Sequence, residues 1–356
     1  MKVAIIGTVG LPATYGGWET LVDHLTKKLN NQFDITVFCS GNRYEKKLEY
    51  YNGVKLEYIS LDANGVQSIF YDVVSIVKAL KFADTLLILG VSGCVFLPLV
   101  KLFSGKKIIV NIDGMEWCRD KWGKFAKWFL KLSESMAIRF ADIIVADNKA
   151  IQNYISTEYG KPSQFIAYGA DHVFKENINT EILAQYPFLK EKYAFKVCRI
   201  EPENNIHIIL NAFEGIQNID LVIIGNWSNS DYGKSLKKKY DNYSHIHLIE
   251  PIYDQNVLNQ IRSNCYIYIH GHSAGGTNPS LVEAMYLALP IFAFEVIYNI
   301  ETTQNRAKYF NSSHDLLNQL ISIEPSELEM MSKAMKSIAD SNYVWEKIAN
   351  QYAALF

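Results

Sequence analysis

The chain has 356 residues, which is more than one hydrophobic core usually organises and fits two domains of about 150 to 180 residues. Its formal net charge of -2 argues against a uniformly basic protein, so we expect no nucleic-acid partner. The five cysteines are scattered, without a CxxC pair or the Cys/His spacing of a zinc site. We therefore expect a reducing compartment and no bound metal.

The apolar segments are too short or too interrupted to cross a membrane. The run at residues 3–6 is too short for the core of a signal peptide and reads as a buried first strand. The longest apolar stretch, residues 86–100, is shorter than the ~20 residues of a membrane-spanning helix and is broken by glycine and proline. We expect a cytoplasmic protein, with peripheral contact at the inner face of the cell membrane left open.

Short β-branched runs alternate with segments of helical period along the whole chain. Because these runs are continuous and apolar, they are typical of central strands in parallel sheets that carry helices on both faces. The sequence thus predicts an α/β chain with two doubly wound, Rossmann-like domains. The strands are expected at residues 3–6, 35–38, 86–89, 108–112, 143–146 and 165–168, and again at 195–199, 221–225, 246–249, 266–270 and 291–294.

A mostly polar, unperiodic segment at residues 171–180 separates the two groups of strands. We therefore place an N-terminal domain at residues 1–172 and a C-terminal domain at residues 173–340. A final amphipathic helix is expected at residues 344–354, within a tail of residues 341–356 that could pack back on the N-terminal domain.

The first strand runs into the loop GTVGLPATYGGWET, which precedes a helical segment. The adjacent Gly16 and Gly17 allow backbone N–H groups to approach a phosphate at the start of that helix, where the helix dipole favours negative charge. The loop lacks the GxGxxG spacing of a dinucleotide site. A diphosphate cradle and an ordinary strand-to-helix turn both fit this motif.

The segment YIHGHSAGGTNPSLVEAM carries the strongest signal in the sequence. A strand ends in a glycine-rich loop, and Asn278 then suits a helix N-cap, so that free amides point out at the carboxyl edge of the sheet. A diphosphate fits there, and Glu283, one turn further along the helix, suits the hydroxyls of a ribose. The alternative is a capping box formed by Ser280 and Glu283.

The segment VCRIEPENN also follows a strand and precedes a helix. Arg199 at this position can neutralise a leaving diphosphate through planar, bidentate hydrogen bonds. A surface ion pair of Arg199 with Glu201 or Glu203 is the alternative. The interpretation as a phosphate ligand depends on topology, because Arg199 lies at the same sheet edge as the glycine-rich loop.

The segment NIDGMEW follows another buried strand. Its two carboxylates, Asp113 and Glu116, could hold a sugar hydroxyl or take up a proton from an acceptor, although one of them could instead cap the next helix. The chain contains neither an Asp-x-Asp triplet nor a GxxxxGK[ST] loop. A metal-clamped diphosphate and a P-loop nucleoside triphosphatase therefore both lose support.

A helix predicted at residues 121–136 separates an apolar side from lysines, with Trp122 and Trp128 flanking the apolar side. Such a helix can lie on an anionic membrane surface, but an ordinary helix that packs on its own sheet has the same pattern. The lysine run at residues 237–239 is interpreted as a solvated helix face.

Taken together, GLPATYGGWET, NIDGMEW, ADIIVADN, FIAYGAD, RIEPENN and GGTNPSLVEAM resemble glycosyltransferase family 4. The resemblance is strongest to the bacterial rhamnosyltransferase-like subgroup of capsule and polysaccharide synthesis, and it extends in order over nearly the whole chain. It implies the GT-B fold, in which two Rossmann-like domains face a central cleft. It also implies a nucleotide-sugar donor bound mainly by the C-terminal domain, an acceptor held by the N-terminal domain, and retention of anomeric configuration.

The resemblance also implies roles for individual residues. Asp113 and Arg199 are the catalytic candidates, and Tyr15, Glu19 and Glu116 are assigned to the acceptor. The residues assigned to the donor are Gly16, Gly17, Arg199, Asn204, Gly275, Gly276, Thr277, Asn278, Ser280 and Glu283.

Two positions depart from the wider family, because Asn204 stands where a lysine is usual and Gly275 where the first glutamate of a spaced pair is usual. The expected reaction is transfer of a sugar, L-rhamnose from dTDP-L-rhamnose, to a saccharide or lipid-linked saccharide, without metal or other cofactor. An epimerase or hydrolase of the same fold, and a non-catalytic nucleotide-sugar-binding protein, are the rival hypotheses.

Overall fold

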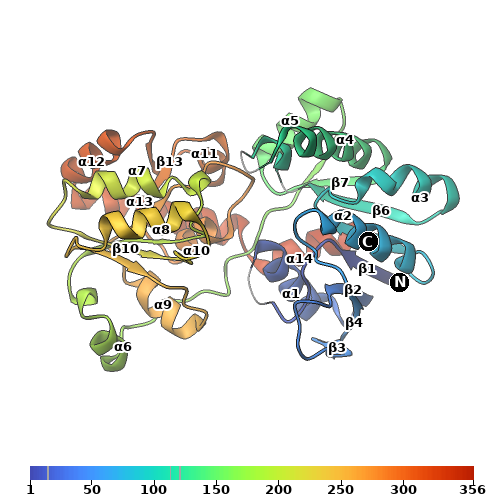
Figure 1. Cartoon of the computed structure of the whole chain (residues 1–356), viewed down its shortest axis with the longest axis horizontal. Coiled ribbons are helices and arrows are strands. Elements are labelled where there is room, and N and C mark those ends of the chain that lie inside the picture. Colours follow the sequence, from blue (N-terminus) through green and yellow to red (C-terminus); the bar gives the residue numbers. More distant parts are fainter. Residues whose placement is uncertain (14–15, 113, 120–121) are drawn as a thin grey trace. The chain divides into compact units, whose positions relative to one another are not determined.

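The computed structural model describes residues 1–13, 16–112, 114–119 and 122–356 (Figure 1). The chain divides into two compact units. The first consists of Met1–Tyr168 together with Trp345–Phe356, and the second of Gly169–Val344. The chain thus crosses from one unit to the other after Tyr168 and returns at Trp345.

The first unit is built on an eight-stranded sheet of order β3-β4-β2-β1-β5-β6-β7-β8. Its strand pairs are parallel except for the short hairpin of β3 and β4. The central strands are apolar and buried, as the sequence predicted for strands covered on both faces. The strands are β1 (Lys2–Ile6), β2 (Asp34–Ser40), β3 (Tyr50–Tyr51), β4 (Val54–Ile59), β5 (Thr85–Leu89), β6 (Lys107–Ile112), β7 (Ile143–Ala146) and β8 (Gln164–Phe165).

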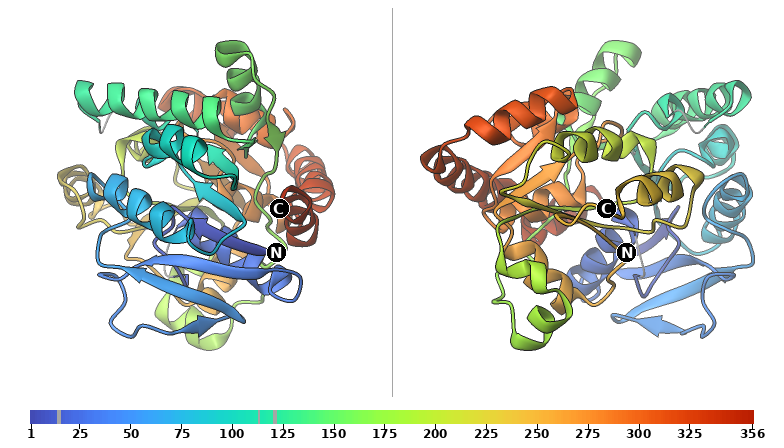
Figure 2. Two further views of the ribbon diagram at one scale, coloured as in Figure 1. Left: turned by 90° about the vertical axis from the view of Figure 1, so that its right-hand side faces the viewer. Right: turned by 60° about the vertical axis from the view of Figure 1, so that its left-hand side comes forward.

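The helices of the first unit lie on both sides of this sheet. The chain runs from β1 through α1 to β2 in one direction and from β4 through α2 to β5 in the other, so right-handed crossovers place α1 and α2 on opposite faces. Figures 1 and 2 show α2, α3 and α4 as neighbours on one side. These elements are α1 (Gly17–Leu29), α2 (Gln67–Ala79), η1 (Cys94–Phe96), α3 (Leu97–Phe103), η2 (Glu116–Cys118), α4 (Lys124–Phe140) and α5 (Lys149–Tyr159).

The last helix, α14 (Trp345–Leu355), packs against α1. The Trp345 ring stacks on His24 with 4.2 Å between the ring centroids. Tyr352 accepts a hydrogen bond of 2.6 Å from the Asn111 side chain at the end of β6, and Lys107 donates one of 2.8 Å to the carbonyl of Phe356. The final residues therefore complete the packing of the first unit.

The second unit is built on a six-stranded, all-parallel sheet of order β11-β10-β9-β12-β13-β14. Its strands are β9 (Tyr193–Val197), β10 (Asp220–Ile224), β11 (Ile246–Ile249), β12 (Ile267–His270), β13 (Ile291–Phe294) and β14 (Lys308–Phe310). The helical elements are α6 (Thr180–Gln185), η3 (Pro187–Lys190), η4 (Pro202–Asn204), α7 (Ile206–Phe213), α8 (Asp231–Tyr240), α9 (Gln255–Ser263), α10 (Pro279–Tyr286), α11 (Ile297–Thr302), α12 (Ser313–Ser322) and α13 (Pro325–Asn342). One face of the sheet carries a core that includes Phe213, Trp227 and Phe292.

The doubly wound, two-domain α/β architecture predicted from the sequence is confirmed. Three strands escaped the prediction, and each lies at or next to a sheet edge. The strand β4 alternates buried and more exposed residues instead of forming a continuous apolar run, and β3 and β14 are very short. Among the described helices, none is long and apolar enough to span a bilayer.

Candidate functional site

The direction of the strand order reverses between β9 and β12 in the second sheet. The chain moves from β9 outward to β10 and β11, and then from β12 outward to β13 and β14. Because all six strands are parallel, the loops that follow β9 and β12 emerge side by side at the carboxyl edge of the sheet. Such a switch point is where open α/β sheets bind ligands. Both glycine- and arginine-containing motifs of the second unit lie in these two loops.

Hydrogen bonds join these two loops along their length. Both the backbone N–H and the hydroxyl of Ser273 donate to the carbonyl of Glu203, each over 2.9 Å. The side chain of Asn205 donates to the carbonyl of Gly271 over 2.9 Å. A Cβ on Gly271 would lie 2.2 Å from the carbonyl oxygen of Asn204, so only glycine permits this approach. The two loops therefore form one structural element.

Asn204 lies inside this element and is only 4% exposed. Its Nδ2 donates to the carbonyl of Arg199 over 2.9 Å, and its Oδ1 lies 3.1 Å from Nδ1 of His272. Both ends of the amide are thus engaged within the protein. Asn204, assigned to the donor in the sequence, thus holds the two loops together in this structure.

Arg199 is partly exposed at the same edge. Its guanidinium lies 3.6 Å from Glu201 and 3.5 Å from Glu203, so the surface ion pairs considered as the alternative are present. Both contacts are long, and a guanidinium has five N–H donors. Arg199 therefore keeps the capacity to bind an anion, with Glu201 and Glu203 as competing partners.

The glycine-rich loop leads directly into α10. Asn278 is the N-cap, as predicted, because its Oδ1 accepts from the backbone N–H of Ser280 over 3.0 Å, and Pro279 opens the helix. Gly275 has a φ of +100°, a conformation that favours glycine. No described residue accepts a hydrogen bond from the N–H groups of Gly275 and Gly276. Together with the helix N-terminus, these amides can bind an anion.

Glu283 points away from the N-terminus of α10, so the capping box considered as the alternative is not formed. Its Oε2 accepts from Nη1 of Arg262 over 2.6 Å, and its Oε1 lies 3.1 Å from Nε2 of His172. Burial alone would raise the pKa of Glu283, but Arg262 and His172 outweigh it and hold the pKa below the ordinary value. Each carboxylate oxygen keeps a lone pair, so the ionised group can still accept two hydroxyl groups.

The sequence analysis did not identify Arg262 and Asn259, the residues that orient Glu283. Arg262 is 5% exposed, and its Nε and Nη2 donate to Oδ1 of Asn259 over 3.0 and 2.7 Å. Asn259 therefore fixes the orientation of Arg262, which in turn orients Glu283. Asn259 and Arg262 are three residues apart on α9 and share a face, but nothing in the sequence indicated that this face meets α10.

A second polar group was also missed, below the glycine-rich loop. His270 ends β12 and is 1% exposed, and neither ring nitrogen has a hydrogen-bond partner among the described residues. Burial, reinforced by Lys196 and His272, holds the pKa of His270 well below the ordinary value, so the ring is neutral. Burial likewise lowers the pKa of Lys196 on the neighbouring strand β9.

In the first unit, the loop after β1 is held by Glu19. This side chain is 5% exposed, and its Oε1 accepts from the Thr8 hydroxyl over 2.9 Å and from the Val9 N–H over 2.8 Å. Burial raises the pKa of Glu19, although these hydrogen bonds oppose the rise. Glu19, assigned to the acceptor in the sequence, thus uses one carboxylate oxygen to hold the loop itself. Tyr15 lies outside the described residues.

Gly16 needs to be glycine in this loop. Its φ is +130°, and a Cβ would lie 2.1 Å from Oε2 of Glu19. Gly16 immediately precedes α1, which Gly17 begins, and the first N–H groups of a helix have no partner within it. The geometry of a possible anion cradle is therefore present, and Glu19 is the residue that shapes it.

The loop after β6 contains the other carboxylate assigned to the acceptor. Glu116, in η2, pairs with Arg119 over 2.8 Å and accepts from the Trp122 indole over 3.0 Å. Asp113, the catalytic candidate of this loop, lies outside the described residues. Glu116 is thus partly neutralised by protein groups, with 21% of its side chain exposed.

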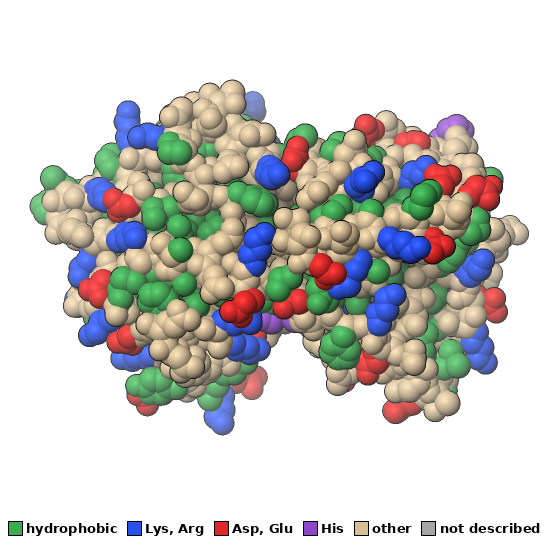
Figure 3. All heavy atoms as spheres, turned by 180° about the vertical axis from the view of Figure 1, so that it is seen from behind, with side chains coloured by type: hydrophobic (Ala, Val, Ile, Leu, Met, Phe, Trp, Pro, Cys, Tyr) green, Lys and Arg blue, Asp and Glu red, His purple; other side chains and the backbone are tan. Residues whose placement is uncertain are grey.

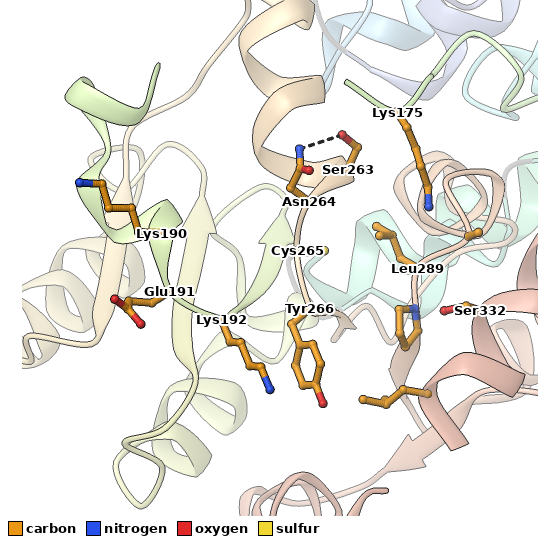
Figure 4. A pocket seen from close by; sticks show the side chains of 13 residues that line it. Lys175, Lys190, Glu191, Lys192, Ser263, Asn264, Cys265, Tyr266, Leu289 and Ser332 are labelled. Atoms are coloured by element: carbon orange, nitrogen blue, oxygen red, sulfur yellow. Dashed lines mark hydrogen bonds between the residues drawn. The ribbon is translucent and has the colours of Figure 1, made fainter. Parts of the chain in front are cut away.

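A cavity of about 430 Å³ lies at the opposite edge of the second sheet (Figure 4). Its lining includes Lys192, Tyr266 and Pro290, which directly precede β9, β12 and β13. In Figure 4 the side chains of Lys192 and Tyr266 lie side by side, with the ammonium 4.8 Å from the ring centroid. The cavity therefore shares no residue with the loops at the carboxyl edge.

On the face shown in Figure 3, basic and acidic side chains are interspersed and no basic field is formed. Among the residues that the structure describes, no group of three or more His, Cys, Asp or Glu side chains is arranged to hold a metal ion.

Residues 179–342 match the family model of glycosyl transferases group 1. The second unit is thus similar to the glycosyl transferases of group 1 over these residues. The group 1 match includes β9, β12 and both joined loops, whereas residues 1–171 match a domain of unknown function, DUF1972. The comparison with curated proteins finds no match.

Solved structures match both units together. Sucrose-phosphate synthase from Thermosynechococcus elongatus is 15% identical with a TM-score of 0.83, over 99% of this chain and 98% of that chain. Anabaena HepE in complex with UDP is 16% identical with a TM-score of 0.78, over 99% of both chains. A putative UDP-N-acetylglucosamine 2-epimerase from Listeria monocytogenes is 14% identical with a TM-score of 0.67, over 99% of this chain and 94% of that chain. At these identities the likeness shows the fold, which is GT-B.

Proposed function

We propose that the chain is a glycosyltransferase that moves a sugar from a nucleotide-diphosphate donor to a saccharide or lipid-linked saccharide. The match to glycosyl transferases group 1 and the GT-B fold support sugar transfer from a nucleotide-sugar. The donor would bind to the group 1 domain and the acceptor to the first unit. Cytoplasmic synthesis of a bacterial surface polysaccharide is the setting that the resemblance to family 4 favours.

The observation that carries this proposal is the placement of Glu283 behind an anion-binding loop. Gly275 and Gly276 present backbone amides that no described residue accepts from, just before the N-terminus of α10, and Glu283 lies one helical turn beyond, ionised and held by Arg262. A diphosphate on the amides would bring its pentose next to Glu283, whose remaining lone pairs can accept from the 3′-hydroxyl of a deoxyribose or from both hydroxyls of a ribose. An ordinary capped helix needs no such buried, charge-paired carboxylate.

The proposed chemistry is electrostatic stabilisation of the leaving diphosphate. Arg199, the loop amides and the dipole of α10 would oppose the charge that develops as the bond to the sugar breaks. The acceptor hydroxyl would attack on the face that the diphosphate leaves, with retention of configuration, and its proton would pass to the departing phosphate or to Asp113. The absence of an Asp-x-Asp triplet in the sequence favours a mechanism without metal.

The sugar and base of the donor follow from the resemblance and from the neighbouring structures. The rhamnosyltransferase-like resemblance favours L-rhamnose from dTDP-L-rhamnose. HepE, one of the GT-B neighbours, binds UDP and UDP-glucose, so a uridine nucleotide is the competing donor.

An epimerase or hydrolase is the second candidate, favoured by the likeness to the putative epimerase from Listeria monocytogenes. It would consume the donor without an acceptor. A non-catalytic nucleotide-sugar-binding protein, suggested by Asn204 and Gly275, would bind the donor and leave it intact with every acceptor. Product analysis with and without a saccharide acceptor separates these three outcomes.

The donor site is tested by thermal shift with dTDP, UDP, GDP and ADP and their sugars, with and without EDTA. We expect one nucleotide diphosphate to stabilise the protein, independently of EDTA, and this stabilisation to be lost in Glu283→Gln and Arg199→Ala. Glu329→Gln is the matched control, because Glu329 lies exposed on α13 in a surface pair with Lys333. Stabilisation by none of the nucleotides, or equal stabilisation of wild type and Glu283→Gln, would refute the assignment.

A further inference from the structure

The outer surface of the helices α2, α3 and α4 exposes large apolar side chains. These helices lie on one side of the first sheet, and α3 contacts α4 (Figures 1 and 2). Each helix contributes to the exposed set, which we call the α2–α4 surface. Its main members are Phe70 on α2, Leu102 and Phe103 on α3, and Phe125 and Trp128 on α4, with exposures of 62%, 72%, 79%, 77% and 60%. A group of this size on one helical layer is typical of an interaction surface.

The expected amphipathic helix is only part of this surface. The sequence left open whether the apolar side of residues 121–136 meets a membrane or packs on its own sheet. In the structure Leu130 is buried and Phe129, Leu132 and Met136 are half-buried, as the packing alternative requires. Phe125 and Trp128 instead remain outside, with 5.8 Å between their ring centroids. The exposed apolar area therefore results from three helices together, which no single helical pattern could reveal.

The exposed charge on these helices is basic throughout. The two acidic residues of the three helices, Asp72 and Glu134, are 3% and 1% exposed. The exposed or half-exposed charges are Lys78, Lys101, Lys124, Lys127, Lys131 and Arg139. Neighbouring elements supply Glu57, Asp142 and Glu158, which pair with Lys78, Lys101 and Lys131.

The inner face of α4 is held by hydrogen bonds of Ser133 and Glu134. Glu134 accepts hydrogen bonds from Tyr154 over 2.7 Å and from Tyr159 over 2.6 Å, and from the Trp117 indole over 3.2 Å. Ser133 donates to the carbonyl of Val91 and accepts from the N–H of Val95. The exposed side chains on the outer face of α4 therefore project from a fixed helix.

We propose that the α2–α4 surface binds an anionic phospholipid bilayer. Aromatic and aliphatic side chains among lysines are the chemistry of interfacial helices, in which the apolar groups enter the acyl boundary and the cations meet the headgroups. A second copy is a poorer occupant, because a twofold contact would place two basic surfaces against each other. The inference deepens the proposed function, since a lipid-linked acceptor would be met at this membrane, but its physical basis is independent of catalysis.

The test is sedimentation of the full chain with vesicles. Vesicles of phosphatidylcholine with about 30% phosphatidylglycerol are compared with pure phosphatidylcholine vesicles, each at low and high salt. The anionic phosphatidylglycerol headgroups attract basic side chains, and salt screens this attraction. We expect binding to the anionic vesicles that weakens with salt, and an approximately tenfold weaker partition for Phe103→Glu and for Trp128→Glu. Ile321→Glu and Met330→Glu, which change exposed apolar residues of the second unit, should bind as wild type does.

Three outcomes would overturn the proposal. Binding that ignores the vesicle charge contradicts the electrostatic argument. Equal loss in the Ile321 and Met330 controls contradicts the assigned surface. Self-association without lipid that Phe103→Glu abolishes, measured by light scattering, would assign the surface to a second copy. The nucleotide thermal shift of each variant should stay unchanged, so failure here is distinct from failure of the proposed function.

Discussion

Replacing Arg262 by methionine should destabilise the second unit strongly. Arg262 and Glu283 are both largely buried, and their charged atoms are 2.6 Å apart. Removing one member leaves the other charge buried without its partner, which typically costs about 3 to 5 kcal/mol. We therefore expect Arg262→Met to lower the unfolding free energy by about 3 kcal/mol, because part of Glu283 reaches solvent and His172 remains beside it.

The same reasoning predicts the result of the double variant. Glu283→Gln removes the carboxylate charge, so adding it to Arg262→Met should recover part of the loss. We expect the double variant to be more stable than the sum of the single effects by about 1 to 3 kcal/mol. Urea denaturation of the four proteins, followed by circular dichroism, measures this coupling. Additive effects would refute the view that Arg262 stabilises an ionised Glu283.

The pH dependence gives an independent check. In wild type the pKa of Glu283 is lowered, so its contribution to stability is present above the unfolded pKa and is lost as pH falls through the folded value. Without Arg262, burial would raise the pKa, and a protonated Glu283 would be tolerated. The difference between wild type and Arg262→Met should therefore shrink as pH falls from 8 to about 4.5. A difference that is constant with pH would contradict this account.

Two further predictions concern the first unit. Gly16→Ala should lower the unfolding free energy of this unit by about 1 to 3 kcal/mol, because the new Cβ meets Glu19 at a positive φ. Thermal denaturation measures the loss, and Gly105→Ala is the control because the space around its Cβ is open. Equal effects of the two substitutions would refute the argument. Asp72→Asn should change the pH dependence, because burial raises the pKa of Asp72 to about 8, even though it accepts from the Gly93 N–H. The wild type then binds more protons folded than unfolded and loses stability as pH rises from about 4 to 8, whereas the variant does not. Denaturation at pH 5 and pH 9 measures this, and an equal change in both proteins would contradict it.

The sequence was sufficient to predict the architecture, because central parallel strands can be recognised as continuous apolar runs. It failed for β4, where alternation near the sheet edge gives a different pattern, and for the very short β14. The N-cap Asn278 could be predicted because capping is local in sequence. The partners of Glu283 could not, because Arg262 lies 21 residues away and His172 lies 111 residues away.

Two of the assigned residues prove to shape the loops in which they lie. Glu19 and Asn204 were chosen as polar residues in loops at the right sheet edge, and both prove to be buried and committed to the loops themselves. A loop that holds an anion must satisfy its own backbone groups while it leaves a few amides free. Some of its polar side chains are therefore consumed in shaping it, and residue type alone does not separate these from the ligands.

Asn204 also bears on how phosphate charge would be neutralised. The resemblance to family 4 expects a lysine at this position, and the structure instead places a buried amide that joins Arg199 to His272. The neutral amide can both donate and accept here, whereas a lysine can only donate. In this chain a neutral amide that joins the two loops therefore stands where the resemblance implies a lysine. Stabilisation of a leaving diphosphate would then depend more on preorganised amides of the glycine-rich loop and on Arg199, whose position the Asn204 amide fixes through its backbone.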